Sequence, residues 1–202
     1  MKVTINEMEK MLETYTLSAK TIDDLYSILH VFNLNKHQIF LKEGQICDYW
    51  SYIAQGLVRI FYYKRRKEVI DYFASEGDYF FSAESYFKRT PSVLIQEALE
   101  PSIIYAFRYD EFEELCRKNS EVGLFFRKTI ENSLINAQHR LDSLQFETAQ
   151  ERYEKLAKDI PQIILRVPSI YIASYLGITP ETLSRVRAKS NISIDICRHE
   201  IS

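Results

Sequence analysis

The chain has 202 residues, of which 26 are lysine or arginine and 28 are aspartate or glutamate, so its net charge is −2. This length allows one or two domains with a buried core. No apolar run reaches the roughly eighteen residues of a membrane-spanning helix, and the acidic first segment lacks the apolar block of a signal peptide. We therefore expect a cytoplasmic protein without a membrane partner.

The cysteines and histidines argue against a metal centre. Cys47, Cys116 and Cys197 are far apart in the sequence and none belongs to a C-x-x-C motif, so free thiols are expected. Only His37 among the histidines falls in the strand-rich region, which is too few for a cupin-like metalloenzyme. The sequence also lacks glycine-rich phosphate loops, nucleophile elbows and H-E-x-x-H motifs, so we expect no enzyme.

The first half of the chain has the pattern of an antiparallel β-roll. After a short amphipathic helix predicted over 22–32, runs rich in Tyr, Phe, Ile and Val alternate with turn signals such as Gly44, Gly56 and Gly77. Many short strands at this spacing predict a jelly roll. Most of their aromatic side chains should pack in the core, and a few could line a pocket for an apolar effector. The predicted strands cover 37–42, 48–54, 57–64, 68–75, 93–99 and 102–108.

Two helices are predicted after the roll. Asp110 and Glu113 resemble a capping box at the start of the first, and Ser120 begins a longer second helix. Apolar residues in this second helix recur at steps of three and four, close to the repeat of a coiled coil. From the residues alone, such a seam either pairs with its twin in a homodimer or packs on the roll. The seam consists of Val122, Phe126, Ile130, Leu134, Ala137, Leu141 and Leu144.

The segment 167–189 predicts two short helices joined by a tight turn. A further helix, from Thr148 to Lys158 and ended by Pro161, leads to this segment. An apolar helical stripe stops just before Gly177, which suits a left-handed helix end. Thr179 follows as a hydroxyl N-cap, with a proline at the first helical position. Such a pair is either a DNA-binding helix-turn-helix or an ordinary helical hairpin.

A helical wheel separates the second helix into two faces. Leu183 and Val186 would pack on the first helix, whereas Glu181, Ser184 and Arg185 would point outward. Arginine can form two hydrogen bonds with guanine and glutamate can accept from cytosine, so this outward face is predicted to read bases. The predicted contacts with the phosphate backbone are Ser169, Thr182, Arg187 and Lys189, and the cap residues Thr179 and Pro180 complete the DNA-binding set.

The segment ASYLGITPETLSRVRAK, residues 173–189, resembles the helix-turn-helix of the cyclic-AMP receptor protein/FNR (Crp/Fnr) family of bacterial transcription regulators. The resemblance extends through the roll and covers about Ile22 to Lys189. It implies base readers at Glu181 and Arg185 and a homodimer along the long helix, which favours the dimer reading of the seam. It also implies a near-palindromic operator in double-stranded DNA, with RNA polymerase as a further partner.

The resemblance also bears on cofactors. The iron–sulfur oxygen sensors of the family carry an N-terminal cysteine cluster, whereas this chain has no cysteine before Cys47. We therefore expect no Fe–S centre.

The chain departs from the family at the cyclic-nucleotide cassette. Residues 76–80, EGDYF, resemble its start, but Phe81-Ser82 replaces a Gly-Glu pair and Pro91-Ser92-Val93 replaces Arg-Ser-Ala. The glycine would let backbone amides approach the phosphate, and the arginine would neutralise its charge. We expect no response to cyclic AMP, and the sequence does not identify another effector. An effector pocket would involve Phe80, Phe81, Ser82, Arg89 and Ser92.

Together these features predict an α+β fold in three parts. These are an N-terminal helix and jelly-roll β-roll of the cyclic-nucleotide-binding type over 1–118, a dimerisation helix over 119–146 and a helix-turn-helix domain over 147–202. The predicted function is that of a dimeric, sequence-specific DNA-binding transcription regulator. The alternative is a ligand-binding roll that regulates a protein partner and carries a vestigial DNA-binding domain.

Overall fold

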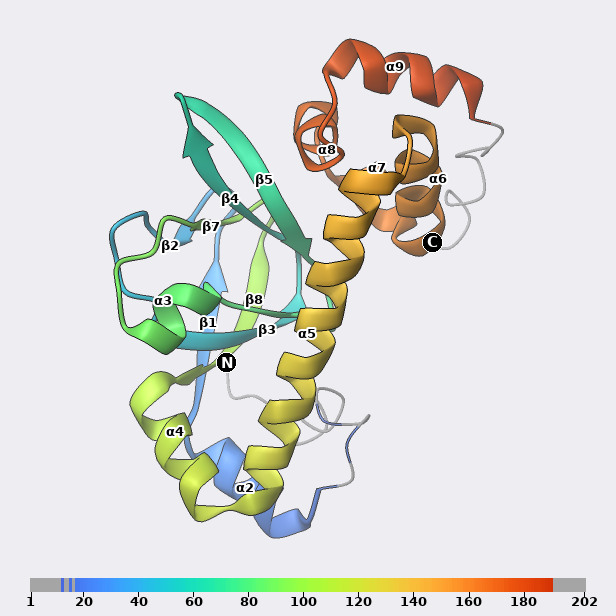
Figure 1. The fold of residues 1–202 in the computed structure, drawn as a ribbon. Coiled ribbons are helices and arrows are strands. Elements are labelled where there is room, and N and C mark those ends of the chain that lie inside the picture. The colour runs from blue at the N-terminus through green and yellow to red at the C-terminus, as the bar shows by residue number, and fades with distance from the viewer. Residues whose placement is uncertain (1–11, 13–14, 16, 191–202) are drawn as a thin grey trace. The chain divides into compact units, whose positions relative to one another are not determined.

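A computed structural model of the chain describes residue 12, residue 15 and residues 17–190 (Figure 1). The chain divides into two compact units. The first extends to Tyr62 and resumes over Asp71–Ser133, whereas the second combines Tyr63–Ile70 with the chain from Leu134 onward. This division differs from the three parts expected from the sequence. Residues 63–70, within the strand-rich region, group with the C-terminal part of the chain, and the helix predicted over 119–146 is divided between the two units.

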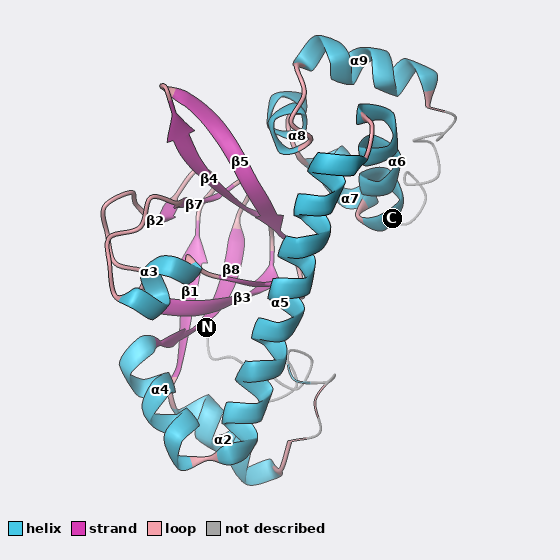
Figure 2. Ribbon diagram, viewed as in Figure 1, coloured by secondary structure: helices cyan, strands magenta, loops and turns pink. Residues whose placement is uncertain are grey.

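The roll of the first unit consists of two four-stranded sheets (Figure 2). The strand order is β1-β8-β3-β6 in one sheet and β2-β7-β4-β5 in the other. All six strands predicted from the sequence are confirmed, and two are added, β1 and the two-residue strand β6. The bounds are β1 Leu29–Leu34, β2 Ile39–Leu41, β3 Tyr49–Gln55, β4 Val58–Lys64, β5 Lys67–Ala74, β6 Tyr79–Phe80, β7 Ile95–Ala98 and β8 Ser102–Arg108.

The start of the described chain differs from its prediction. The sequence predicts a helix over 22–32, but helix α2 covers Ala19–Ser27 and strand β1 covers Leu29–Leu34. The Ser18 hydroxyl accepts from a backbone amide in the first turn of α2 and so caps the helix. The second part of the predicted helix is wrong because β1 pairs with β8 along its whole length. This non-local ladder outweighs the local helical periodicity.

Two clusters of buried side chains hold the first unit together. One contains the fully buried Ile53 and Ile104, on neighbouring strands of one sheet. The other is largely aromatic, and the Trp50 ring lies 4.8 Å from Phe112 and 5.5 Å from Phe125 between ring centres. Such ring pairs stabilise a core beyond the area that they bury. The aromatic cluster therefore joins the strands to the helices that follow them.

A charged pair is buried within the second sheet. Arg59 of β4 lies opposite Glu97 of β7, and its Nη2 donates to the carboxylate at 2.6 Å. The His37 ring nitrogen lies 2.8 Å from the other carboxylate oxygen, and the guanidinium lies 4.0 Å from the centre of the Phe61 ring. Removal of one partner would leave a buried charge uncompensated. Replacement of either residue alone should therefore destabilise the fold.

The helix after β8 begins differently from the prediction. Asp110 and Glu113 do not form a capping box, because Arg108 is the N-cap and Asp110 lies within the first turn. The carboxylate of Asp110 lies 3.1 Å from the Arg108 guanidinium. An acidic residue in the first turn remains favourable to the helix dipole. The remaining helices of this part are α3 Ala83–Lys88, α4 Tyr109–Lys118 and α5 Ser120–Phe146.

Helices dominate the second unit. Thr148 and Glu151 form a capping box at the start of α6. Pro161 does more than end α6, because it also occupies the first turn of a new helix, α7. No helix in the described part of the chain is both long and apolar enough to cross a membrane. The helices after α5 are α6 Ala149–Asp159, α7 Pro161–Arg166, α8 Ser169–Tyr175 and α9 Pro180–Lys189.

Gly56, in the turn between β3 and β4, offers a test of the roll. Its φ is +101°, and a Cβ there would lie 2.7 Å from the Cα of Ser102. We expect Gly56→Ala to lower the free energy of unfolding by about 3 kcal/mol or more, since left-handed strain adds to a backbone clash. Gly77→Ala is the matched control, because its φ is +95° but nothing lies within 4 Å. Its destabilisation should be about 1–2 kcal/mol in urea denaturation, and equal values for the two variants would contradict the clash.

Candidate nucleic-acid interface

Helices α8 and α9 are joined by a short turn whose geometry follows from its residues. Gly177 has a φ of +66°, the left-handed conformation expected from the sequence. The Thr179 hydroxyl accepts from the amide of Thr182 at 3.2 Å and caps α9, which begins with a proline. The predicted end of one helix and start of the next are therefore both confirmed.

One face of α9 is buried. Leu183 and Val186 are only 1% and 7% exposed, and α9 packs on α6 and α8. Burial of such a side chain contributes about 1.5–3 kcal/mol, so these two residues fix the rotation of α9 about its axis. Within the same unit the other buried side chains of the helices and their C-caps are Tyr153, Leu156, Ile163, Val167, Ile172, Ala173 and Leu176.

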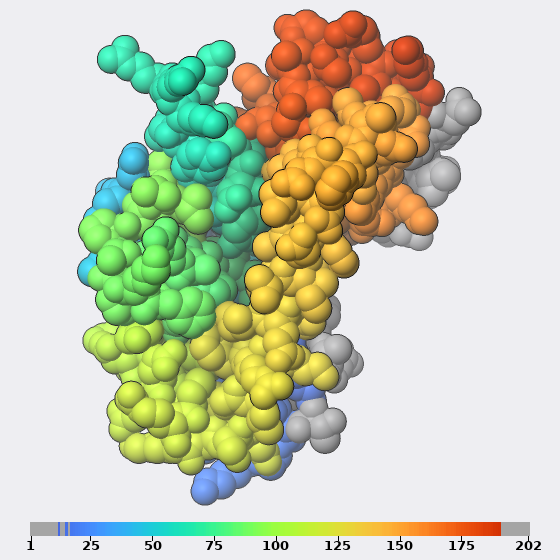
Figure 3. Space-filling view, viewed as in Figure 1, coloured from blue at the N-terminus to red at the C-terminus, as the bar shows by residue number. Residues whose placement is uncertain are grey.

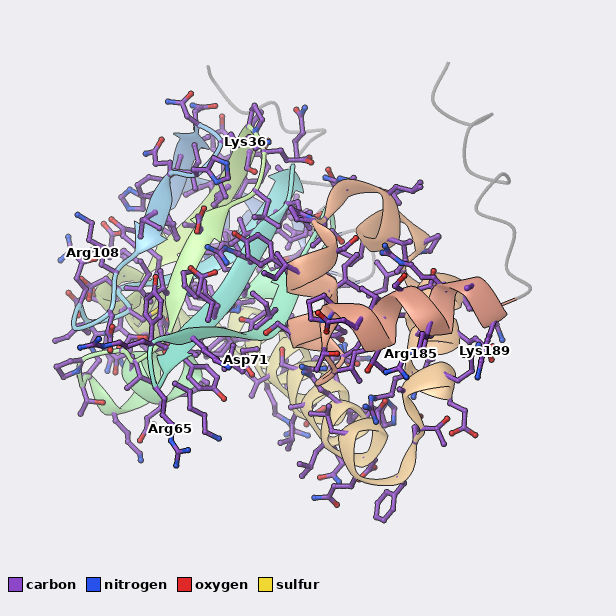
Figure 4. The ribbon with its side chains drawn as sticks, turned by 90° about the horizontal axis from the view of Figure 1, so that it is seen from above. Lys36, Arg65, Asp71, Arg108, Arg185 and Lys189 are labelled. Carbon is purple, nitrogen blue, oxygen red and sulfur yellow. The ribbon has the colours of Figure 1, made fainter. Side chains whose placement is uncertain are left out.

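The other face of α9 is open to solvent. Glu181, Ser184, Arg185 and Lys189 are all exposed. Figure 4, which looks down on α9, shows Arg185 and Lys189 extending from this helix. The polar face predicted to read bases therefore lies outward, as the helical wheel requires.

The first turn of α9 organises the polar groups beside this face. The pKa of Glu181 is lowered, mainly by its hydrogen bond with the Thr179 side chain, so Glu181 is a hydrogen-bond acceptor at neutral pH. Nη2 of Arg185 lies 3.3 Å from the Thr182 hydroxyl. The Thr182 hydroxyl therefore bonds within the helix, to the Thr179 hydroxyl and to Arg185.

Two residues assigned to phosphate contacts bond to each other. Nη1 of Arg187 donates to the Ser169 hydroxyl at 2.7 Å. The Nε of Arg187 is buried and has no hydrogen-bond partner among the described residues, and the guanidinium lies 5.9 Å from the centre of the Tyr153 ring. This pair ties α9 to the start of α8. The structure therefore places Arg187 between helices rather than on the exposed face.

Two arginines that the sequence did not single out close the end of α8. Arg140 donates to the carbonyl of Tyr175 at 2.8 Å and lies 3.8 Å over its ring, and Arg152 donates to the carbonyl of Leu176 at 2.9 Å. Carbonyls at a helix C-terminus lack intrahelical partners, and cations interact favourably with the dipole there. These partners are 35 and 24 residues apart in the chain, so no local pattern marks them.

The end of the β4–β5 hairpin docks on α8 within the second unit. The Ser174 hydroxyl accepts from the amide of Ile70 at 3.0 Å and donates to the carbonyl of Glu68 at 3.3 Å. A hydroxyl can do both at once, so one side chain of α8 bonds two backbone groups of β5. We call this contact the Ser174 bridge. Nη2 of Arg140 lies 3.5 Å from the Ile70 carbonyl and adds a weaker contact.

The counterpart of the cyclic-nucleotide cassette, in the first unit, is closed by its own hydrogen bonds. The hydroxyls of Ser82 and Ser92 are 2.9 Å apart, and both residues are buried. The Ser82 amide donates to the sulfur of Cys47 at 3.4 Å. Phe80 and Phe81 are buried as well. The structure thus brings Ser82 and Ser92 together with their hydroxyls bonded to the protein, whereas Phe80 and Phe81 pack in different core clusters.

Arg89, the fifth predicted pocket residue, is also engaged. It ends α3 in the left-handed conformation, with a φ of +55°. Its Nη1 donates to the Cys47 carbonyl at 2.9 Å and its Nη2 pairs with Asp48. The guanidinium lies 4.1 Å over the Tyr109 ring. A phosphate would have to displace these partners to recruit Arg89.

The seam of α5 changes character along the helix. Val122 is completely buried in the aromatic cluster, and Phe126 and Ile130 are partly buried against the same cluster. Val122 therefore has no exposed surface that could contact a second copy, so its assignment to the dimer seam was wrong. The later residues are exposed, with Leu134 70% exposed. The exposed part of the seam consists of Leu134, Ala137, Leu141 and Leu144.

The roll is similar to a known protein family. Residues 31–119 match the family model described as "Cyclic nucleotide-binding domain". The matched segment contains β2 to β8 and most of β1, which are the strands of the roll. No curated protein sequence matches the chain closely enough to add to this result.

Solved structures define the fold of a larger part of the chain. FixK2 from Bradyrhizobium japonicum is 20% identical, with 80% of this chain and 83% of that chain covered and a TM-score of 0.66. The catabolite activator protein of Thermus thermophilus is 19% identical, with 88% and 84% covered and a TM-score of 0.56. The regulator CLP of Xanthomonas campestris is 17% identical, with 85% and 91% covered and a TM-score of 0.63. The chain therefore has the fold of Crp/Fnr family regulators.

The Ser174 bridge predicts a local change in hydrogen exchange. Ser174→Ala removes the acceptor of the Ile70 amide, so we expect that amide to exchange up to about tenfold faster, in line with the net strength of one hydrogen bond. Ser184→Ala, on the exposed face of α9, is the matched control and should leave Ile70 unchanged. An unaltered Ile70 rate in the first variant, measured by NMR, would show that the hydroxyl does not hold the hairpin.

Proposed function

We propose that this protein is a dimeric, sequence-specific DNA-binding transcription regulator of the Crp/Fnr type, acting in the cytoplasm. The observation that carries the proposal is the orientation of α9, whose apolar side is buried on α6 and α8 while its polar side is exposed. A second helix held in this way by a first is the arrangement that enters the major groove. The shared fold with Crp/Fnr regulators supports it.

The exposed residues of α9 have separate roles in this proposal. Arg185 donates two hydrogen bonds to a guanine, and Glu181 accepts from a cytosine amino group. Ser184 lies on the same exposed face and reaches a base or the adjacent sugar–phosphate. Lys189 binds a phosphate, which positions the helix without reading sequence. Ser169 and Arg187 hold the two helices in register through their mutual bond.

The proposed dimer uses the exposed seam of α5. Leu134, Leu141 and Leu144 are 70%, 49% and 41% exposed, and their spacing of seven and three residues matches a coiled-coil seam. Pairing of two copies along this helix would cover these side chains. A two-fold dimer presents two α9 helices to half-sites about one DNA turn apart, so the operator is near-palindromic.

We also propose that cyclic AMP is not the effector. The residues present do not fit its phosphate, because Ser82 and Ser92 already bond to each other and Arg89 already pairs with Asp48. The buried ring of Phe81 stands where the family pattern has a glycine. No iron–sulfur cluster is proposed either.

An Arg185→Ala variant tests the reader helix. We expect it to weaken operator binding by about 1–3 kcal/mol and to relax the preference at one base pair in each half-site. Lys189→Ala is the control, because it removes a proposed phosphate contact instead of a base contact. It should weaken binding to all sequences alike. Selection of bound fragments from random duplexes, followed by titration, measures both. If the function were only to bind another protein, the unaltered chain would select no operator and Arg185→Ala would change no DNA affinity.

Calorimetric titration with cyclic AMP tests the cassette. We expect no binding heat and no change in the unfolding temperature at micromolar to millimolar nucleotide, because the polar groups of the cassette are satisfied within the protein. Ser92→Ala removes one hydroxyl from that network and serves as a control for stability, and it should be equally unresponsive. Saturable micromolar binding to the unaltered protein would contradict the proposal.

A further inference from the structure

Four consecutive basic residues form the end of the β4–β5 hairpin. They are Lys64, Arg65, Arg66 and Lys67, and all are exposed. The turquoise atoms at the end of this hairpin stand out from the surface in Figure 3. No other stretch of the sequence has more than two consecutive lysines or arginines. The net charge of −2 conceals this local concentration of positive charge at the basic hairpin end.

The turn is built from residues that do not favour it. Arg65 and Arg66 form the two-residue loop between β4 and β5, with φ angles of +50° and +64°. A two-residue hairpin loop with positive φ at both positions is a type I′ turn, which favours Asn-Gly. The left-handed conformation costs an arginine about 1–2 kcal/mol relative to the right-handed one. Backbone strain of this kind concentrates at functional sites. A function of the positive charge would explain why two arginines occupy a turn that favours Asn-Gly.

The basic hairpin end is fixed to the proposed DNA-binding helices. The Ser174 bridge joins β5 at Glu68 and Ile70 to α8, and Tyr63–Ile70 belongs to the same compact unit as α8 and α9. From Ile70 to the turn is four residues, roughly 13 Å of extended strand. In a helix-turn-helix bound to DNA, the first helix crosses the phosphate backbone while the second enters the groove. A basic element attached to α8 is therefore attached to the helix nearest the backbone.

We propose that the basic hairpin end is a second DNA-contacting element, which binds backbone phosphates next to the site read by α9. This inference rests on the proposed function. In the described part of the second unit, the hairpin end is the one piece of β-structure.

Phosphates fit this element better than bases or an acidic protein do. Arg65 and Arg66 lie at the tip of the turn and Lys64 and Lys67 flank it, so the charge is concentrated in a narrow projection. Figure 4 shows Arg65 as well as Arg185 and Lys189 in the view onto α9. A narrow basic projection can lie against the DNA backbone, where each phosphate carries one negative charge at a regular spacing. Binding of an acidic protein instead would leave DNA affinity independent of these four residues.

The test replaces the turn by Arg65→Asn/Arg66→Gly in the full chain. Asn-Gly suits a type I′ turn, so the unfolding temperature should stay the same or rise. DNA affinity should fall by about fivefold at physiological salt for each phosphate that the turn no longer neutralises, and the slope of log K against log salt should become shallower by about 0.9 per phosphate. The fall should be equal for the operator and an unrelated duplex, because phosphate contacts carry no sequence information.

Two further variants keep the result interpretable. Lys64→Gln/Lys67→Gln removes two charges without touching the turn and should show the same direction of change. Lys36→Gln/Arg117→Gln removes two exposed charges from the first unit and should leave affinity and slope as in the wild type.

The outcomes separate the two proposals. If the wild type selects no duplex, the proposed function fails and the hairpin contact fails with it. If the wild type selects an operator and the hairpin variants bind it with unchanged affinity and salt slope, only the hairpin contact is overturned, and a protein partner becomes the better account of its charge.

Discussion

The burial of one apolar stripe of α9 is the constraint on which the proposed DNA interface depends. Leu183 and Val186 occupy the interior of the helical unit, and a rotation of one residue, about 100°, would carry them into solvent. The turn limits the remaining freedom, because Gly177 takes the left-handed conformation and Thr179 caps the helix. The direction of Arg185 is therefore set by groups that do not touch DNA in the proposal, including the bond between Ser169 and Arg187.

The roll illustrates how a fold can be kept while the chemistry of its site changes. Residues 31–119 match the cyclic nucleotide-binding domain, and the sheets and aromatic core are intact. At the cassette, however, the hydrogen-bonding capacity of Ser82, Ser92 and Arg89 is directed to protein groups. Buried polar groups must be satisfied somewhere, and here the protein satisfies them internally. Similarity to the domain and binding of the ligand after which it is named are thus separate questions.

Local chemistry decides which parts of this structure can be predicted from sequence. The turn around Gly177 and Thr179 was predictable because its signals lie within a few residues of one another. Residues 29–34 were not, since their strand depends on pairing with β8, and neither was the burial of Val122 in the aromatic cluster. Arg140 closes a helix end that lies 35 residues away. Tertiary partners, rather than weak propensities, account for these differences.

The exposed turn at Arg65 and Arg66 has a consequence for how such a protein could diverge. Tyr63 and the four residues after it are all exposed, so exchanging them leaves the core untouched. Replacement of either arginine by a residue that accepts a positive φ would even relieve backbone strain. Selection could therefore adjust the charge at this place one amino acid at a time, raising or lowering general attraction to polyanions while the sequence specificity proposed for α9 stays constant.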